Sequence, residues 1–229
     1  MSAQIPLEKP VPKLQLVVFD MDGLLIDTEP LAIMAWMQAG KEYGYDITRP
    51  VMERMIGLDA RSSLEIMYAL YGTDFPYDMF VLRKREIINA HVLQHGIQVK
   101  PGVLTLLDFL DAQHLPRVVA TSTGKARAQH HLETAGIWSR MDALFSGEEV
   151  TNGKPAPDLF LHAANSVGIC PQACVVFEDS TNGVLGAFRA GMLAVQVPDL
   201  LAPNEITQQS ASYILSSLEQ APDLLRNWL

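Results

Sequence analysis

The chain alternates between short apolar runs and longer segments with helical periodicity. Runs of four or five largely β-branched or aromatic residues, with a weaker fifth run, occur at 16–19, 117–121, 173–177, 193–197 and 213–215. Such runs are typical of strands buried on both faces. Apolar residues recur at helical spacing between them, at 103–110, 125–135, 157–167 and 217–226. This alternation predicts an α/β fold with a parallel sheet built from right-handed βαβ units.

The stretch from about residue 30 to residue 99 interrupts this alternation. It contains helical periodicity after Thr28, a possible helix cap, then from Ser62, where Ser-Ser-Leu-Glu fits a capping box, and again over 77–95. An all-helical block directly after the first strand is most simply an inserted domain. We therefore expect a discontinuous core of residues 1–29 and 99–229 and an all-helical domain of residues 30–98.

Composition and charge narrow the class of protein. Apolar residues make up 48% of the 229 positions, enough for a sizeable core, and the net charge is −9. This charge disfavours nucleic acid and anionic membranes as partners. No apolar run of the sequence reaches membrane-spanning length, and we expect no secretory signal at the proline-broken start. Cys170 and Cys174 are expected to be reduced thiols of a cytoplasmic protein, rather than a disulfide or half of a metal site.

Two aspartates directly follow the first predicted strand. Asp20 and Asp22 are separated by one residue, and side chains at i and i+2 of an extended chain point the same way. Two carboxylates crowded at a buried strand end are costly unless a cation lies between them. This is the first indication of a metal ion.

Polar residues follow two more of the predicted strands. Thr121-Ser122-Thr123 follows one apolar run and Glu178-Asp179-Ser180 follows another. Each segment alone is typical of a helix N-cap. In an open parallel sheet, however, ligands bind at the carboxyl ends of the strands. Four acids gathered there favour a hard cation held by oxygen ligands, most naturally Mg²⁺.

A lysine lies in a proline-rich loop, Asn-Gly-Lys-Pro-Ala-Pro, at residues 152–157. A lysine in such a loop is often simply solvated. Beside the acids, Lys154 would instead hold a carboxylate that acts as a nucleophile, and it would bind an anion as a point charge.

These segments, in this order, resemble the four motifs of the haloacid dehalogenase superfamily of phosphotransferases. The motifs are Asp20-Met21-Asp22-Gly23, Thr121, Lys154 and Glu178-Asp179. The helical insert and the phrase Gly-Lys-Pro-Ala-Pro-Asp resemble the branch that contains beta-phosphoglucomutase and small sugar-phosphate phosphatases. The resemblance implies a Rossmann-like core with a helical cap domain.

The resemblance also implies a role for each acid. Asp20 would be the nucleophile that forms an aspartyl-phosphate, and Asp22 would be the general acid and base. Mg²⁺ would be held by Asp20, the backbone carbonyl of Asp22 and Asp179, with Glu178 as an additional or outer ligand.

Two further motifs would bind the phosphoryl group of the substrate. Thr121 would contact a phosphoryl oxygen with Ser122 nearby, and Lys154 would neutralise charge on the nucleophile and on the phosphoryl group.

The reaction type follows from one residue that is present and one that is missing. Asp22 favours phosphoryl transfer over dehalogenation, because a halide leaving group needs no proton. The mutase branch carries a histidine shortly after the first motif, where this chain has Pro30-Leu31-Ala32. We therefore expect a phosphatase, with a beta-phosphoglucomutase-type mutase as the alternative. A binding module without turnover is disfavoured, because every motif residue is present.

The histidines lie outside the motif segments. We expect surface or satisfied core residues at His91, His95, His114, His130, His131 and His162.

The insert resembles the cap that closes over the site in this family. Within it, the candidates for substrate contact are Gly57, Arg61 and Lys84, the last in the basic run 83–85. A solvated helix face is the alternative for that run. The expected partner is a small phosphorylated metabolite, and the expected protein is a monomer or weak homodimer.

Overall fold

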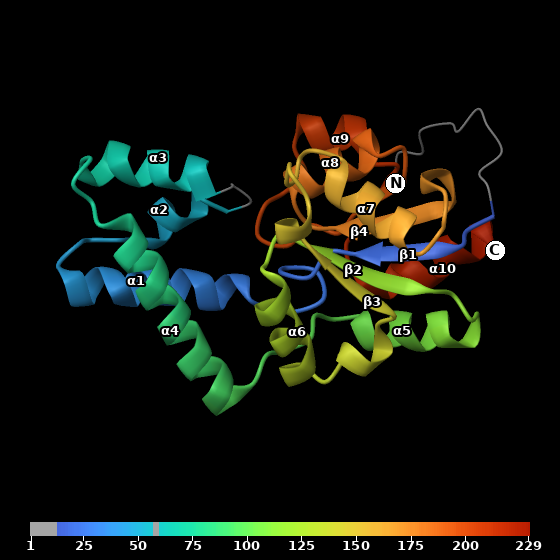
Figure 1. The fold of residues 1–229 in the computed structure, drawn as a ribbon, viewed down its shortest axis with the longest axis horizontal. Coiled ribbons are helices and arrows are strands. Elements are labelled where there is room, and N and C mark those ends of the chain that lie inside the picture. The colour runs from blue at the N-terminus through green and yellow to red at the C-terminus, as the bar shows by residue number, and fades with distance from the viewer. Residues whose placement is uncertain (1–12, 57–59) are drawn as a thin grey trace. The chain divides into compact units, whose positions relative to one another are not determined.

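The computed structural model describes residues 13–56 and 60–229. The chain divides into two compact units, one formed by Met1–Ile26 with Gln98–Leu229 and the other by Asp27–Ile97. The first unit is an α/β layer structure, and the described part of the second is helical (Figure 1).

Six parallel strands form the sheet of the first unit, in the order β3-β2-β1-β4-β5-β6. The strands are β1 (Leu16–Phe19), β2 (Arg117–Thr121), β3 (Ala143–Ser146), β4 (Cys174–Glu178), β5 (Leu193–Gln196) and β6 (Tyr213–Ile214). The parallel α/β sheet predicted from the sequence is confirmed. Strand β3 was not anticipated, because this four-residue strand at the sheet edge contains no β-branched residue.

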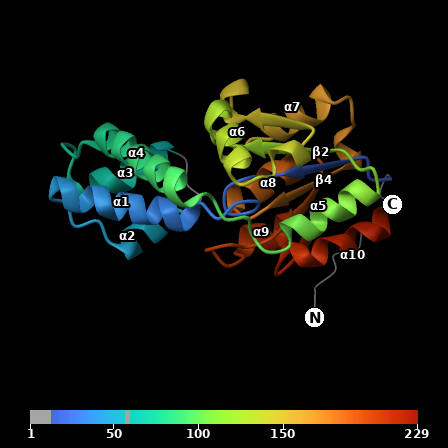
Figure 2. The same ribbon diagram turned by 90° about the horizontal axis from the view of Figure 1, so that it is seen from below.

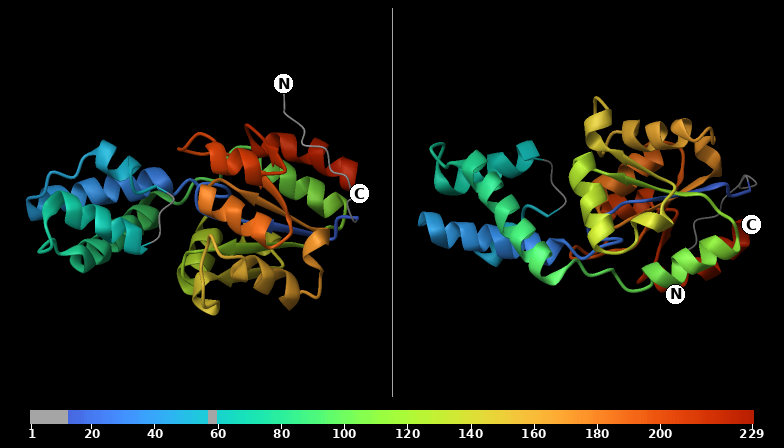
Figure 3. Two further views of the ribbon diagram at one scale, coloured as in Figure 1. Left: turned by 90° about the horizontal axis from the view of Figure 1, so that it is seen from above. Right: turned by 60° about the horizontal axis from the view of Figure 1, so that its bottom comes forward.

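Helices cover both faces of this sheet. Helices α7 and α8 lie over one face and α5 and α10 over the other (Figures 1 and 2), and Figure 3 gives two further views of the layers. The helices of this unit are α5 (Val103–Ala112), α6 (Lys125–Thr134), α7 (Asp158–Ser166), α8 (Thr181–Arg189), α9 (Glu205–Ser210) and α10 (Ala221–Leu225). Short 3₁₀ turns are η1 (Trp138–Arg140), η2 (Gly147–Glu149), η3 (Pro171–Ala173), η4 (Leu218–Gln220) and η5 (Arg226–Trp228). The segment expected as one last helix is therefore η4, α10 and η5.

Strand β1 is fully buried because both of its faces are covered. Leu16 and Val18 belong to a core cluster with residues of α7 and α8, which include Phe160 and Val184. Phe19 lies on the opposite face of the strand from Val18. Its ring stacks on that of Phe177 of β4, with ring centroids 5.7 Å apart. A continuous apolar run is the pattern that such a doubly covered strand requires.

The second unit contains helices α1 (Glu29–Tyr43), α2 (Arg49–Glu53), α3 (Ala60–Tyr71) and α4 (Tyr77–His95), and its described residues include no strand. Trp36 of α1 stacks on Phe80 of α4 in its core, with ring centroids 5.7 Å apart. Two cap expectations were wrong. The Thr28 side chain makes no capping hydrogen bond, and α3 begins two residues before Ser62, which therefore lies inside the helix.

Two further expectations concern membrane spans and cysteines. No helix in the described ranges is long and apolar enough to span a membrane. Both cysteines are free thiols, as expected. The buried Cys174 thiol donates to the Cys170 carbonyl at 3.3 Å, and burial raises the pKa of Cys174 to about 12.

Candidate active site

The register of the sheet brings three strand ends to one point. Phe19, the last residue of β1, pairs with Val119 of β2 and with Phe177 of β4. The residues that follow these positions, Asp20, Ala120 and Glu178, therefore lie side by side at the carboxyl edge of the sheet. The Asp20 amide donates to the Phe177 carbonyl at 3.0 Å, which places the Asp20 side chain beside Glu178 at the carboxyl edge.

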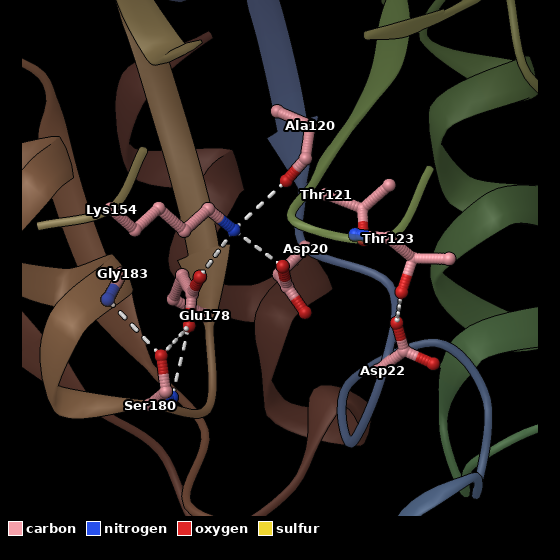
Figure 4. A network of polar contacts seen from close by, with 9 residues as sticks. All are labelled: Asp20, Asp22, Ala120, Thr121, Thr123, Lys154, Glu178, Ser180 and Gly183. Atoms are coloured by element: carbon pink, nitrogen blue, oxygen red, sulfur yellow. Dashed lines mark hydrogen bonds and ion pairs between the residues drawn. The ribbon is translucent and has the colours of Figure 1, made fainter. Parts of the chain in front are cut away.

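Lys154 connects the same three strand ends (Figure 4). Its Nζ donates to Asp20 Oδ1, to Glu178 Oε1 at 2.7 Å and to the Ala120 carbonyl at 2.9 Å. The side chain is 5% exposed, and Nζ lies 5.0 Å from the ring centroid of Phe160. An ammonium has three donors, so Lys154 is held as a fixed positive charge.

Asp20 is surrounded by more negative charge than Lys154 can offset. Burial raises the pKa of Asp20 to about 8; Lys154 opposes this rise, while Glu178 and Asp22 add to it. Burial also acts against the charge of Lys154, but Asp20 and Glu178 outweigh it and raise the pKa of the ammonium above its usual range. One lysine thus serves more than one buried carboxylate, and a further cation would stabilise the ionised form of Asp20.

Asp22 has different partners from those of Asp20. Its Oδ2 accepts a hydrogen bond from Thr123 Oγ1 at 2.7 Å (Figure 4). Thr121 Oγ1 accepts from the Thr123 amide at 3.0 Å; Thr121 is buried and Ser122 is exposed. Thr123 is a site residue that the sequence motifs do not single out. Its only signal was its place in Thr-Ser-Thr.

The loop after β1 positions Asp22. The Leu25 and Ile26 amides both donate to the Met21 carbonyl, at 2.9 and 3.1 Å, which closes a tight turn. Gly23 has a φ of +82°, a conformation that favours glycine. A Cβ atom placed on Gly23 would lie only 2.5 Å from Asp179 Oδ2. The motif therefore needs glycine both for the turn and for the close approach of Asp179.

Three acids could hold a cation. Asp20, Glu178 and Asp179 each offer an oxygen, and these three atoms lie within 4.8 Å of one another. Glu178 Oε1 accepts from Lys154, while its Oε2 accepts from the Ser180 amide and hydroxyl, both at 2.9 Å. Since both Glu178 oxygens are engaged, Asp20 and Asp179 fit direct ligands better and Glu178 fits a supporting position. An all-oxygen donor set suits Mg²⁺.

Three residues expected to contact substrate belong to the second unit. Gly57 lies outside the described residues. Arg61 pairs with Glu65 at 3.2 Å, and its side chain is 89% exposed. Lys84 Nζ lies 5.7 Å from the ring centroid of Trp36. These contacts lie within the second unit, so substrate contact by Arg61 or Lys84 stays a prediction.

One histidine differs from expectation. His131 on α6 is 5% exposed, and neither ring nitrogen has a hydrogen-bond partner within the described ranges. Burial lowers the pKa of His131; Asp22 opposes this effect, and Arg127 and His130 add to it. His131 is therefore a buried residue with unmet polar atoms, close enough to Asp22 to sense its charge. The prediction of a satisfied core or surface residue was wrong here.

The chain is similar in sequence to a known hydrolase family and to proteins named as phosphatases. Residues 17–197 match the family model described as haloacid dehalogenase-like hydrolase. A Drosophila melanogaster protein named "Probable pseudouridine-5'-phosphatase" is 35% identical over 212 residues, which are 90% of this chain and 91% of that protein. The fructose-1-phosphate phosphatase YqaB of Escherichia coli (strain K12) is 36% identical over 188 residues, which are 79% of this chain and 95% of that protein.

The solved structures show the same similarity. A crystal structure of a Thermotoga maritima protein described as a candidate beta-phosphoglucomutase matches with a TM-score of 0.78 and 30% identity. The match covers 94% of this chain and all of that one.

Proposed function

We propose that this chain, which belongs to the haloacid dehalogenase-like hydrolases, is a Mg²⁺-dependent phosphatase of small phosphomonoesters, sugar phosphates above all. Two of the relatives above bear the names of phosphatases, of pseudouridine 5'-phosphate in one case and of fructose 1-phosphate in the other, which supports this substrate class. The observation that carries the proposal is the separation of two neighbouring aspartates. Asp20 is paired with a fixed ammonium, which orients it for attack, and Asp22 is paired with a hydroxyl and can exchange a proton.

Asp20 acts as the nucleophile. A carboxylate oxygen of Asp20 attacks the phosphorus atom, the bond from phosphorus to the ester oxygen breaks, and an aspartyl-phosphate forms. Lys154 fixes the orientation of Asp20 and offsets the charge of the phosphoryl group. Water then attacks the phosphorus, which releases inorganic phosphate and restores the Asp20 carboxylate.

Asp22 moves the protons. In the first step it protonates the departing ester oxygen, and in the second it takes a proton from the attacking water. Because Thr123 donates to Oδ2, the other oxygen of Asp22 is the one that carries the proton. The proton given up in the first step is recovered in the second, so the enzyme is unchanged after one cycle.

The remaining site residues bind the cation and the phosphoryl group. Asp20, Asp179 and the Asp22 carbonyl would hold Mg²⁺, which offsets negative charge as the phosphoryl group is transferred. Thr121 Oγ1 accepts from the Thr123 amide and keeps its own proton to donate to a phosphoryl oxygen. The exposed Ser122 lies beside it.

The helical unit completes the proposal. Residues 27–97 would act as a cap that excludes water and selects the leaving group. A cytoplasmic location, supported by the free thiols, and a monomer or weak homodimer are parts of the same proposal.

A phosphosugar mutase is the second candidate, because of the 30% identity to the Thermotoga maritima structure. Ala32 lies within helix α1, in the segment where the mutase branch carries a histidine. Alanine cannot exchange protons, which favours hydrolysis.

The test is phosphate release from a panel of sugar phosphates and other phosphomonoesters, with Mg²⁺ and with EDTA. A phosphatase releases phosphate steadily and only with the metal. A mutase interconverts hexose phosphates while free phosphate stays nearly constant. Binding of Mg²⁺ and substrate without either reaction would contradict the proposal in favour of a binding module.

A further inference from the structure

A fifth carboxylate lies beside the four acids of the candidate site. Asp199 follows β5 by three residues, and its side chain is 9% exposed. A Cβ atom placed on Gly23 would lie 2.5 Å from Asp179 Oδ2 and 3.4 Å from Asp199 Oδ2. Two carboxylates from different loops thus converge on the backbone of the residue that follows Asp22.

Only one oxygen of Asp199 is paired in the part of the chain that the structure describes. Oδ1 binds Lys100 Nζ at 2.5 Å. Oδ2 is buried, and no described residue donates a hydrogen bond to it. A buried carboxylate oxygen without a partner is unfavourable, so it needs a donor or a cation that the protein itself does not supply.

Gln196 at the end of β5 repeats this pattern. It is 2% exposed, and its Nε2 donates to the Asp179 carbonyl at 3.2 Å. Its Oε1 is buried and, within the described ranges, also lacks a donor. Both unmet atoms beside Asp179 are therefore acceptors. Acceptors are satisfied by a cation or by the waters that a cation carries, and an anion would leave them unmet.

We propose that Asp199 is an outer carboxylate of the divalent-cation site and increases its affinity for Mg²⁺. The inference rests on the proposed function, in which Asp179 and Asp20 hold the cation directly. Mg²⁺ in proteins usually keeps several waters, and Oδ2 of Asp199 accepts hydrogen bonds from them. Asp199 is thus a positioning residue that acts through the cation.

Lys100 fixes Asp199 to the loop that carries Asp22. The Lys100 amide donates to the Leu25 carbonyl at 3.0 Å, and Ile26 forms an antiparallel bridge with Val99. Lys100 therefore joins the β5 loop, through Asp199, to the turn after β1. It also offsets the charge of one more acid in a region already rich in carboxylates.

Calorimetric titration of metal-free protein with MgCl₂ tests the proposal without any measurement of turnover. Loss of an outer partner of a metal site typically costs 10- to 100-fold in affinity. We expect Asp199→Asn to raise the Mg²⁺ dissociation constant about tenfold and Asp179→Asn to raise it further. The matched control is Asp223→Asn, a carboxylate-to-amide change at a surface ion pair where the side chain is 83% exposed. It should leave the dissociation constant unchanged.

The titration separates the two proposals. If Asp179→Asn weakens binding and Asp199→Asn does not, the role of Asp199 is overturned and the proposed function stands. If the unaltered protein binds no Mg²⁺, the proposed function fails, and with it the inference.

A double variant separates the carboxylate of Asp199 from the freed charge of Lys100. Lys100→Met with Asp199→Asn removes both charges of the pair, and we expect Mg²⁺ binding to stay as weak as in Asp199→Asn. Recovery of the original affinity would show that an unbalanced ammonium caused the loss, and would overturn the proposal. The double variant leaves no unpaired charge, so it also gives the answer if the single variant does not fold; the melting temperature in EDTA checks folding.

Discussion

The hydroxyl of Thr123 donates a 2.7 Å hydrogen bond to Oδ2 of Asp22, across 101 positions of the sequence. The bond joins the end of β2 to the loop after β1 and fixes the rotation of the Asp22 carboxyl. It also distinguishes the two Asp22 oxygens, because a hydrogen bond to one leaves the other to take up and release the proton.

We predict that Thr123→Val lowers kcat about tenfold and changes KM little. A hydrogen bond to a charged group contributes about 1.5–3 kcal/mol, and its loss leaves the Asp22 carboxyl free to rotate. Thr123→Ser keeps the hydroxyl and should restore most of the rate. Steady-state kinetics on one sugar phosphate provides the comparison. If the serine variant is no faster than the valine variant, the hydroxyl has no part in orienting Asp22.

We predict that Asp22→Asn slows poor leaving groups far more than good ones. A sugar alkoxide must be protonated as it departs, whereas p-nitrophenolate departs without a proton. The ratio of kcat/KM for a sugar phosphate to that for p-nitrophenyl phosphate should therefore fall by at least tenfold. Equal losses on both substrates would argue against the role of Asp22 as a general acid.

We predict that Asp20→Asn abolishes turnover and leaves the fold intact, because an amide cannot serve as the nucleophile. Phosphate release should fall below a few per cent, and acid-quenched protein should no longer carry label from a labelled substrate. The melting temperature should not fall, since burial already disfavours the charge of Asp20. Retained activity would remove Asp20 from its assigned role.

Gly23→Ala should reduce Mg²⁺ affinity and activity, and Gly136→Ala is its matched control. Gly23 has a φ of +82° and Gly136 a φ of +73°, so each alanine meets a similar backbone cost of about 1–2 kcal/mol. Only at Gly23 does the new Cβ reach Asp179, at 2.5 Å; at Gly136 it meets nothing within 4 Å. Similar melting temperatures with a metal-binding loss confined to Gly23→Ala would confirm the close approach. Equal Mg²⁺ affinity in both variants would contradict it.

Mg²⁺ binding should depend on pH through Asp20. Its pKa is raised by burial from 3.8 to about 8, so the metal-free protein keeps this carboxyl protonated at pH 6, while the unfolded chain does not. Stability of the metal-free protein therefore falls as pH rises from about 4 to about 8. Mg²⁺ requires the ionised form, so its affinity should rise with pH up to about 8 and then level off.

Calorimetry in buffers of different protonation enthalpy measures this coupling. We expect release of nearly one proton per Mg²⁺ at pH 6 and almost none at pH 9. Asp20→Asn should remove the release. Proton release that persists in this variant would assign the titration to another group.

The residues at the strand ends were predictable from the sequence. The side-chain contacts between segments far apart in the sequence were not. Asp20, Thr121 and Glu178 were found because buried runs in a parallel sheet are short and stop at polar residues. The bonds of Thr123 to Asp22 and of Lys100 to Asp199 join segments 101 and 99 residues apart. Such contacts depend on the order of the strands, which alternation of helices and strands leaves open.

Residues with weak local patterns account for the other differences. Strand β3 has no β-branched residue, and the Ser-Ser-Leu-Glu signal at residue 62 lies inside a helix that starts earlier. His131 looked like any helical histidine, because its burial and its proximity to Asp22 arise only when α6 packs in the folded protein.

The bridge between Ile26 and Val99 has a consequence for how such a protein can vary. The chain leaves the sheet unit and returns to it at adjacent points, so the ends of the intervening segment are already held together. Closing a longer or shorter segment between fixed, adjacent ends costs little extra free energy. Insertions, deletions or exchange of whole segments between these two residues would leave the strand register, and with it Asp20 and Lys154, in place. One chemical apparatus could thus be recombined with many different inserts.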